Sequence, residues 1–394
     1  MIMNIDDHHT DFEQMVRDAG IPTTELEMQQ QWDAINSDQG STISNDSNWS
    51  PFWRLISAIV TKPALWVVNF LIMDLLPNSF IKTASDTPLD ILAWSLNLER
   101  KEGIKTKGAI TFYREQINMA LTIPANTRVQ STSINGTVYE LKTVQDATMN
   151  VGETSIDISA EAPHTGSAWN LAPGYYNNLP EPIDTITHVR NNENWIITLG
   201  TNDESNDELR LRCQNQFTAV GQFHHDAAYK AIISQFSGLR IDYIWFEHDA
   251  PRGPGTANVY LMVDSGPAPS DLVAEVNKHI TDYGYHGHGD DLDCFAIPEK
   301  DITLTATTYY EPGLADEKIS ELNSGVEQMI RCAFRENQNF NVSKTWPFNR
   351  FSFSKLDQEI HEQFPELQSI VFSQEDIVSV MELPMLTSFS ITKG

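Results

Sequence analysis

The sequence predicts a multidomain α+β protein with an N-terminal helical region, a central all-β domain and a C-terminal pair of small α+β units. Three observations support this prediction. The chain of 394 residues is longer than one hydrophobic core usually serves. Apolar residues recur at helical spacing over residues 53–98, and short alternating runs replace them over residues 108–199. Beyond residue 200, predicted helices and strands follow one another.

The predicted boundaries follow these changes of pattern. They are an acidic polar arm at 1–50, a helical region at 51–107, a β domain at 108–200, and α+β units at 201–312 and 313–394. The arm contains a Ser-, Asn- and Asp-rich run at 36–50 that cannot bury a core, and one helix is expected in it, at 11–19.

In the helical region, Pro63 and Pro77 are expected to break the apolar pattern into two or three helices. The last of these covers residues 88–98, with Asp86 as its cap. The apolar face of residues 64–76 is wider than a lone surface helix needs, so it packs either on another chain or in the protein's own core. The candidate interface residues are Trp53, Trp66, Leu71 and Leu75.

A membrane span is not expected in this region. Lys62, Pro63 and Asp74 interrupt the apolar stretch, which leaves it short of the ~20 residues that a bilayer requires.

The β domain is predicted from short runs separated by Pro, Gly and Asn. These runs are 109–113, 121–123, 128–131, 139–143, 148–150, 155–160 and 183–189. A loop at 163–178 carries Trp169, Tyr175 and Tyr176, which form a sugar site, anchor an interface or pack within the loop itself.

The two α+β units are predicted from helical patterns that alternate with strand patterns. In the first unit, helices are expected at 207–220, 224–236 and 269–283, and strands at 241–247, 258–263 and 302–309. In the second, helices are expected at 315–336 and 353–363, and strands at 369–372 and 386–391.

Composition limits the partners and the compartment. The formal net charge of −28 opposes binding to nucleic acid and to anionic lipid surfaces. Cys213, Cys294 and Cys332 are widely spaced and odd in number, which fits a reducing cytoplasm better than a disulfide framework. The N-terminus has no basic segment followed by an apolar run, so no secretory signal is expected.

Candidate chemistry is sparse. The Gly-rich segment 285–293 brings together potential metal ligands, but its spacing fits no established metal motif, and a solvated loop is the other interpretation. The candidate ligands are His286, His288, Asp290, Asp291 and Asp293. His224, His225 and Asp226 lack a partner nucleophile in the sequence pattern. Neither a nucleophile elbow nor a phosphate-binding or dinucleotide motif is present, so we expect no enzyme activity and no cofactor.

The segment 200–212, GTNDESNDELRLR, lies between the β and the α+β patterns. Asp203 or Ser205 is expected to cap a helix whose first turn is acidic. Glu204, Arg210 and Arg212 complete the charged residues of this predicted domain junction.

The same segment resembles the baseplate J-like family, the wedge proteins of contractile phage tails and related injection machines. The resemblance rests on Gly200, Glu204, Ser205 and the pair Leu209-Arg210. Further short matches precede this segment and occur in the same order as in the family: Thr83-Ala84, Leu89-Asp90, 98–100, Gly108, 123–127, Gly136, Tyr139, Gly166, Asn170 and Gly174. Asn126 stands where the family usually has Gly, and Asn202 where it usually has Asp. Asn tolerates a left-handed turn and keeps a side-chain oxygen, so both changes are compatible with the pattern.

The resemblance implies a structural role without enzymatic activity. It implies a sixfold ring of wedges around the tail hub, with a second copy of this chain in each wedge, other wedge proteins as partners, and contacts to neighbouring wedges. The ring widens to trigger sheath contraction, and residues 103–108 and 199–202 are candidate hinges. The expected location is the virion tail baseplate, assembled in the bacterial cytoplasm. The alternatives are a metal-binding enzyme or module built on 286–293, and a carbohydrate-binding adhesion module.

Overall fold

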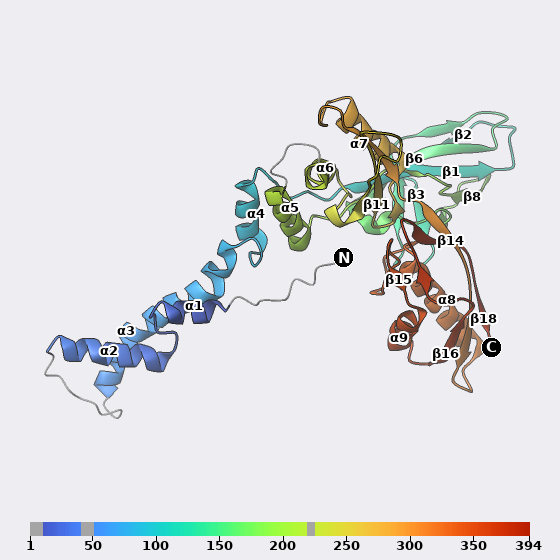
Figure 1. The fold of residues 1–394 in the computed structure, drawn as a ribbon. Helices are drawn as coiled ribbons and strands as arrows, with labels where there is room; N and C mark the ends of the chain where they lie inside the picture. The colour runs from blue at the N-terminus through green and yellow to red at the C-terminus, as the bar shows by residue number, and fades with distance from the viewer. Residues whose placement is uncertain (1–10, 41–50, 219–224) are drawn as a thin grey trace. The chain divides into compact units, whose positions relative to one another are not determined.

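The computed structural model describes residues 11–40, 51–218 and 225–394, without the side chains of 51–54 and 217–218. Within it the chain forms two compact units, residues 1–99 and 100–394. The predicted class is confirmed: a helical N-terminal region precedes an antiparallel β domain and small units of strands and helices (Figure 1).

The first unit consists of helices. Its elements are α1 (Phe12–Asp18), α2 (Glu25–Asp38), α3 (Pro51–Phe70), the π-turn η1 (Leu71–Leu75), the 3₁₀ turn η2 (Pro77–Ser79) and α4 (Asp86–Trp94). Its small core contains Val16 of α1, Val68 of α3 and Ile72 of η1. Helix α2 was not predicted, although Thr24 and Glu27 form a complete capping box at its start.

Two predictions for this unit are wrong. Pro63 does not break the helix but lies inside α3, which continues as η1 to Leu75. A proline removes one backbone donor and displaces the preceding turn, so the packing of Val68 and Ile72 must hold the helix through this position. Asp86 is not the cap of α4: it is the first helical residue, with φ of 51°, and Ser85 occupies the cap position.

The central β domain is a curled antiparallel sheet. Its strands are β1 (Lys105–Arg114), β3 (Arg128–Ser131), β4 (Glu140–Thr143), β6 (Ser155–Thr165), β7 (Tyr176–Asn178), β8 (Ile186–Arg190) and β9 (Ile196–Thr198). They follow the order β7-β3-β4-β6-β1-β8, with β9 also on β1, while β2 (Leu121–Ile123) pairs with β5 (Ala147–Met149). Asn191 receives hydrogen bonds from Gly174 and Tyr176 beside the two end strands, which brings these ends together into a nearly closed barrel.

Two residues of the barrel have a local structural explanation, one in its backbone conformation and one in its close packing. Asn126 has φ of 63°, which confirms that it makes the left-handed turn expected of it. Gly108 lies against Trp195, and a Cβ atom there would be 2.2 Å from Trp195 Cε3 and 2.5 Å from the Trp195 carbonyl oxygen. The barrel therefore has no room for a side chain at residue 108.

We expect Gly108→Ala to lower the free energy of unfolding by about 3 kcal/mol, because the carbonyl of Trp195, which accepts from Ala109 N, cannot move without shifting strand β9 that begins at the next residue. Urea unfolding followed by tryptophan fluorescence measures this change. The matched control is Gly136→Asn, a residue with φ of 76° and no heavy atom within 4 Å of an added Cβ. Equal stability of Gly108→Ala and wild type would contradict the tight packing at Trp195.

The first α+β unit contains α5 (Asn206–Thr218), α6 (Asp226–Ile233), η4 (Ile241–Tyr243), β10 (Ile244–Glu247), β11 (Thr256–Val263), β12 (Gly266–Pro267), α7 (Ser270–Thr281) and β13 (Asp291–Ala296). β11 lies between β10 and β13, antiparallel to the first and parallel to the second. β13 was not predicted, because its sequence follows the Gly-rich segment that we interpreted as a connection.

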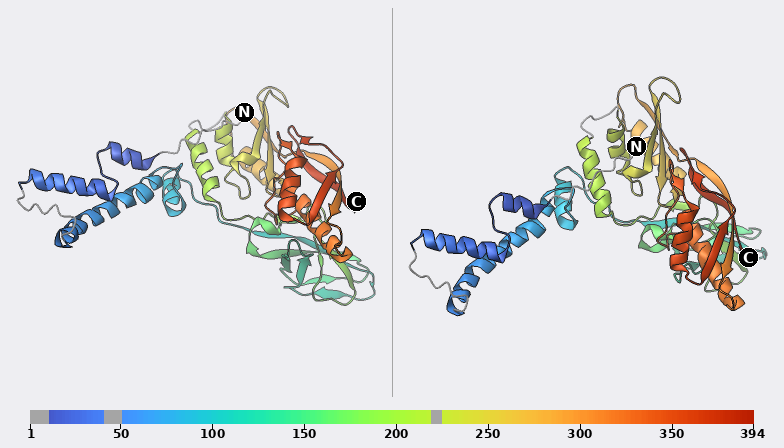
Figure 2. Two further views of the ribbon diagram at one scale, coloured as in Figure 1. Left: turned by 90° about the horizontal axis from the view of Figure 1, so that it is seen from below. Right: turned by 60° about the horizontal axis from the view of Figure 1, so that its bottom comes forward.

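The second α+β unit contains β14 (Glu299–Tyr310), α8 (Asp316–Ala333), β15 (Arg350–Phe351), α9 (Phe353–Gln363), β16 (Leu367–Phe372), β17 (Ile377–Val378) and β18 (Leu383–Lys393). Its main sheet has the order β16-β14-β18, and α8 and α9 cover one face (Figure 2). The strand that we had predicted in the first unit, at 302–309, is β14 and pairs with β16 and β18 instead.

The three cysteines are buried and free. Burial raises the pKa of Cys294 to about 12 and also raises the pKa of Cys213 and Cys332. The reactive thiolate is therefore scarce at neutral pH. We expect a thiol reagent such as Ellman's reagent to label none of them rapidly at pH 8 in the native chain and all three in denaturant, as absorbance will show; rapid labelling of the native chain would contradict this burial.

Candidate functional site

The junction 200–212 is fixed by a glycine that has no room for a side chain. A Cβ atom on Gly200 would lie 2.1 Å from Thr106 Oγ1 and 2.4 Å from the Gly166 carbonyl oxygen. The amide of Asn170 holds both sides of this residue, since its oxygen accepts from Gly200 N at 2.9 Å and its nitrogen donates to Gly200 O at 2.7 Å. The chain therefore leaves the barrel in one defined direction.

Ser205 is the cap of α5. Its hydroxyl accepts from Glu208 N at 3.3 Å, and the Glu208 carboxylate accepts from Ser205 N at 2.8 Å, which completes a capping box. Asp203, the other predicted cap, instead accepts a hydrogen bond of 2.8 Å from Gly103 N. Asn202 accepts from Ser167 N at 3.3 Å and ties the junction to the barrel.

Glu204 and Arg212 form a buried ion pair. Arg212 Nη1 lies 2.8 and 2.6 Å from the two carboxylate oxygens, and the side chains of Glu204 and Arg212 are only 2% and 9% exposed. The carboxylate also accepts from Lys101 N at 3.0 Å. Arg210, in contrast, pairs with the exposed Asp207 on the surface of α5. The pair thus joins the chain entering the barrel to the helix that leaves it.

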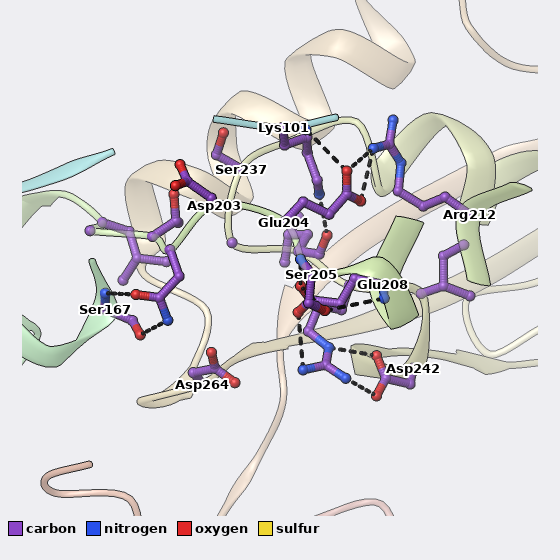
Figure 3. Close-up of a pocket in the computed structure, with 18 of the residues that line it drawn as sticks. Lys101, Ser167, Asp203, Glu204, Ser205, Glu208, Arg212, Ser237, Asp242 and Asp264 are labelled. Carbon is purple, nitrogen blue, oxygen red and sulfur yellow. Dashed lines mark hydrogen bonds and ion pairs between the residues drawn. The ribbon is translucent and has the colours of Figure 1, made fainter. Parts of the chain in front are cut away.

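A cavity of about 260 Å³ lies beside this pair (Figure 3). Lys101 Nζ donates to the carbonyl oxygens of Ser234, Phe236 and Leu239 at 2.9, 3.3 and 3.0 Å. Burial lowers the pKa of Lys101 to about 8, while Glu204 opposes this shift. On the other wall Arg240 binds Asp242 through two nitrogens. Lys101 thus binds backbone carbonyl oxygens and Arg240 binds a carboxylate, as is usual for polar groups that hold parts of a structure together.

The candidate metal ligands of segment 285–293 are engaged in separate contacts. Around segment 285–293, Tyr229 donates to Asp290 at 2.5 Å, and Arg252 pairs with Asp291 and Asp293 at 2.9 Å each. His286 is engaged with the carbonyl of Gly287 at 3.0 Å, and His288 lies in the turn that the hydrogen bond from Asp290 N to Gly287 O closes. Among the described residues, no group of three or more His, Cys, Asp or Glu side chains is placed to hold a metal.

The aromatic loop of the barrel faces inward. Tyr176 is fully buried and donates to the Trp169 carbonyl at 2.9 Å. Trp169 and Tyr175 also pack against the barrel core. Of the histidine pair, His225 is the N-cap of α6, Asp226 lies 3.4 Å from exposed His248, and His224 is outside the described residues. The contacts of Trp169 and Tyr176 show that the aromatic loop packs against the barrel core.

The sequence interpretation missed the segment that joins α8 of the second unit to the barrel. Asn339 accepts from the Tyr139 hydroxyl at 3.0 Å, Ser167 donates to Gln338 at 2.9 Å, and Tyr175 donates to Glu336 at 3.2 Å. Its sequence, RENQNFN, is polar and has no helical or strand period. No local signal identifies such a contact.

Helix α3 has two different faces. The inner face contains Ser57, Thr61, Val68 and Ile72, which are buried within the first unit. The outer stripe, about 150° away around the helix at 3.6 residues per turn, consists of exposed Leu55, Ile59, Trp66, Phe70 and Met73. Trp66 and Met73 are 70% and 73% exposed, so this outer stripe has no cover within the described residues.

The four predicted interface residues have different environments. Trp66 and Leu75 are exposed, whereas Leu71 packs against the core of its own unit. Trp53 lies in α3, but its side chain is outside the described residues. The segment Leu55–Leu75 is 21 residues long and contains an 18-residue window with a mean hydropathy of 1.8, so by length and composition alone it is able to cross a membrane. This corrects the expectation that Lys62, Pro63 and Asp74 leave the stretch too short, because the helix continues through Pro63.

Comparisons with known proteins found a family model, a relative and a solved structure that are similar to this chain. Residues 109–198 match the family described as "Baseplate J-like protein barrel domain". The chain is 43% identical over 339 residues to "Putative baseplate protein gp29" of Haemophilus phage HP1, covering 86% of each sequence. It is also similar to a chain in the cryo-EM structure of the anti-feeding prophage baseplate, with 10% identity, coverage of 85% and 83%, and a TM-score of 0.32. A TM-score this low does not by itself establish a common fold.

Proposed function

The chain belongs to the baseplate J-like family, and we propose that it is a wedge protein that links neighbouring wedges in a ring around the hub of a contractile tail. Its role is structural and its location is the tail baseplate of a virion. The relative from phage HP1, which is named a baseplate protein, matches this chain along most of its length. We further propose that the chain assembles in the host cytoplasm and acts without enzymatic chemistry or a cofactor.

The outer stripe of α3 is the observation that carries this proposal. Five apolar side chains, from Leu55 to Met73, line one side of a helix in a protein whose net charge is −28. Helices with such a face bury it against other helices. We propose that α3 bundles with the same helix of a second copy and with helices of other wedge proteins. Insertion of Leu55–Leu75 into a lipid bilayer is the competing use of this face.

The connections of the barrel support a mechanical role. Ile104 and Thr201 exchange two backbone hydrogen bonds of 2.9 Å, so the chain enters and leaves the barrel at adjacent positions. A domain is able to turn about two such adjacent connections, as in a hinge, once its other contacts release, which here are those of residues 336–339 with the barrel and of Asn170 with Gly200. We propose that residues 103–108 and 199–202 flex when the sixfold ring widens and triggers sheath contraction, with two copies of the chain per wedge in different conformations.

Electron cryo-microscopy of the chain co-expressed with its genomic neighbours tests this proposal. We expect a closed sixfold ring in which α3 lies in a helical bundle and this chain makes the wedge-to-wedge contacts. Particles in which α3 is solvent-exposed, or a chain that partitions into liposomes instead of entering a ring, would overturn the proposed bundle. Elemental analysis and a glycan array on the same sample separate the metal-binding and carbohydrate-binding alternatives.

A further inference from the structure

Strand β18 forms a free edge of the second α+β unit. It pairs in parallel with β14, from Glu299↔Leu383 to Thr308↔Lys393, and is the terminal strand of the order β16-β14-β18. No other strand of the described residues pairs with its outer edge. The backbone groups that point away from β14 are therefore available to an additional strand.

The last part of this edge, residues 388–392, lacks the features that normally prevent strands from pairing, although Pro384 and the irregular register at Thr387 interrupt β18 before it. Natural edge strands are protected by charged residues, prolines or bulges. Here the register shifts between Ile302 and Thr303, which leaves Thr387 without a Cα partner on β14. Beyond this shift, residues 388–392 contain neither a charged residue nor a proline, although 20% of the chain is charged. The final five-residue segment before Lys393 is thus a regular and unprotected edge.

The two faces of the edge differ sharply. Phe389 and Ile391 pack against the core beneath the sheet. On the outer face, hydroxyl groups form three rungs with β14: Ser388–Thr303 at 3.3 Å, Ser390–Thr305 at 3.2 Å and Thr307–Thr392 at 3.2 Å. A strand that fits this edge must place apolar side chains below and small polar side chains above.

We propose that the occupant of this edge is β18 of a second copy, which pairs antiparallel across a twofold axis near Ser390 to form a six-stranded sheet. Such a contact places apolar beside apolar and hydroxyl beside hydroxyl side chains, and it is self-complementary. It also places Lys393 of one copy beside Thr387 of the other, whose hydroxyl donates to Asp301 at 2.9 Å. The Lys393 ammonium, which lies 3.2 Å from Asp316 of its own chain, would thereby approach a second carboxylate, Asp301 of the other copy, and the two groups have opposite charges.

Charge favours this edge over the opposite edge of the same sheet. Two copies with a net charge of −28 repel one another wherever acidic groups approach. At β16, Glu366 and Glu375 lie just beyond the two ends of the strand, so an antiparallel twofold pair centred on it would bring Glu366 of one copy near Glu375 of the other, and like charges that approach are destabilising. β18 presents no such pair, which makes it the edge at which two copies of this acidic chain fit.

A single introduced cysteine tests the contact in the full chain, because the three native cysteines are buried. In the proposed pair the two Ser390 residues face each other, with Cβ atoms about 4.5–5.5 Å apart. We expect Ser390→Cys to form a disulfide-linked dimer when oxidised with copper phenanthroline. The control Thr305→Cys lies on the same face of the central strand, about 14 Å from its counterpart, and should remain monomeric.

A second variant measures the association itself. We expect Ser390→Lys, an exposed change, to raise the dimer dissociation constant at least tenfold in light scattering and sedimentation, with an unchanged unfolding curve. The Ser390→Cys dimer should also persist in the Trp66→Glu background, which separates this contact from the α3 bundle and from the proposed function. Absence of a Ser390→Cys dimer, equal cross-linking at Thr305→Cys, or unaltered association of Ser390→Lys would each overturn the proposal.

Discussion

We expect Glu204→Ala to lower the free energy of unfolding by about 3–5 kcal/mol. The substitution removes the carboxylate from a guanidinium that is 9% exposed, so Arg212 keeps its charge in a poorly solvated place without that counter-ion. It also removes the acceptor of Lys101 N, which adds the desolvation cost of a backbone donor. Urea unfolding at neutral pH, followed by circular dichroism, measures the change.

Two further variants identify the cause. Asp207→Asn removes a surface ion pair from the same helix and should change stability by less than about 1 kcal/mol, because Asp207 is 93% exposed. The double variant Glu204→Met with Arg212→Leu removes both charges and should recover most of the loss. If Glu204→Ala behaves like Asp207→Asn, or if the double variant is the least stable, the buried pair does not hold the junction as we describe.

Local sequence signals predicted the elements of this junction but not their partners. Ser205 and Glu208 are three residues apart, the spacing of a capping box, and the structure contains that box. Glu204 and Lys101 are 103 positions apart, and their hydrogen bond has no periodic or motif signal. The same reason explains β14, which was predicted as a strand but whose pairing with β18 depends on residues about 85 positions away.

The remaining errors have specific physical causes. Helix α2 has a clear capping box at Thr24 but no buried residue, so a search for an apolar stripe misses it. Pro63 was expected to end the helix, but residues on both sides of it are buried, Ser57 and Thr61 before it and Val68 after it, and this packing maintains α3. For Tyr176 and Trp169 the sequence left a sugar site, an interface anchor and packing within the loop open, because a sequence does not show which way a loop folds. In the structure Tyr176 is buried in the barrel core and Trp169 packs against it.

The second large effect that we expect is on assembly and concerns the outer stripe of α3. Trp66→Glu should prevent incorporation into baseplates, because a buried interfacial tryptophan commonly contributes 2 kcal/mol or more and a carboxylate in its place would be desolvated without a partner. In the free chain Trp66 is 70% exposed, so the variant's stability should stay within about 0.5 kcal/mol of wild type. Complementation of a gene deletion, with particles scored by electron microscopy, measures incorporation.

Matched controls separate assembly from folding in this experiment. Gln30→Glu introduces the same charge on the exposed surface of α2 and should assemble normally. Ile72→Glu instead places a charge in the core of the first unit and should lose both stability and assembly. Because the outer stripe and the inner face belong to one continuous helix, only Trp66→Glu should leave a folded chain that fails to assemble. If it assembles like Gln30→Glu, the outer stripe is not the contact that joins this chain to the ring.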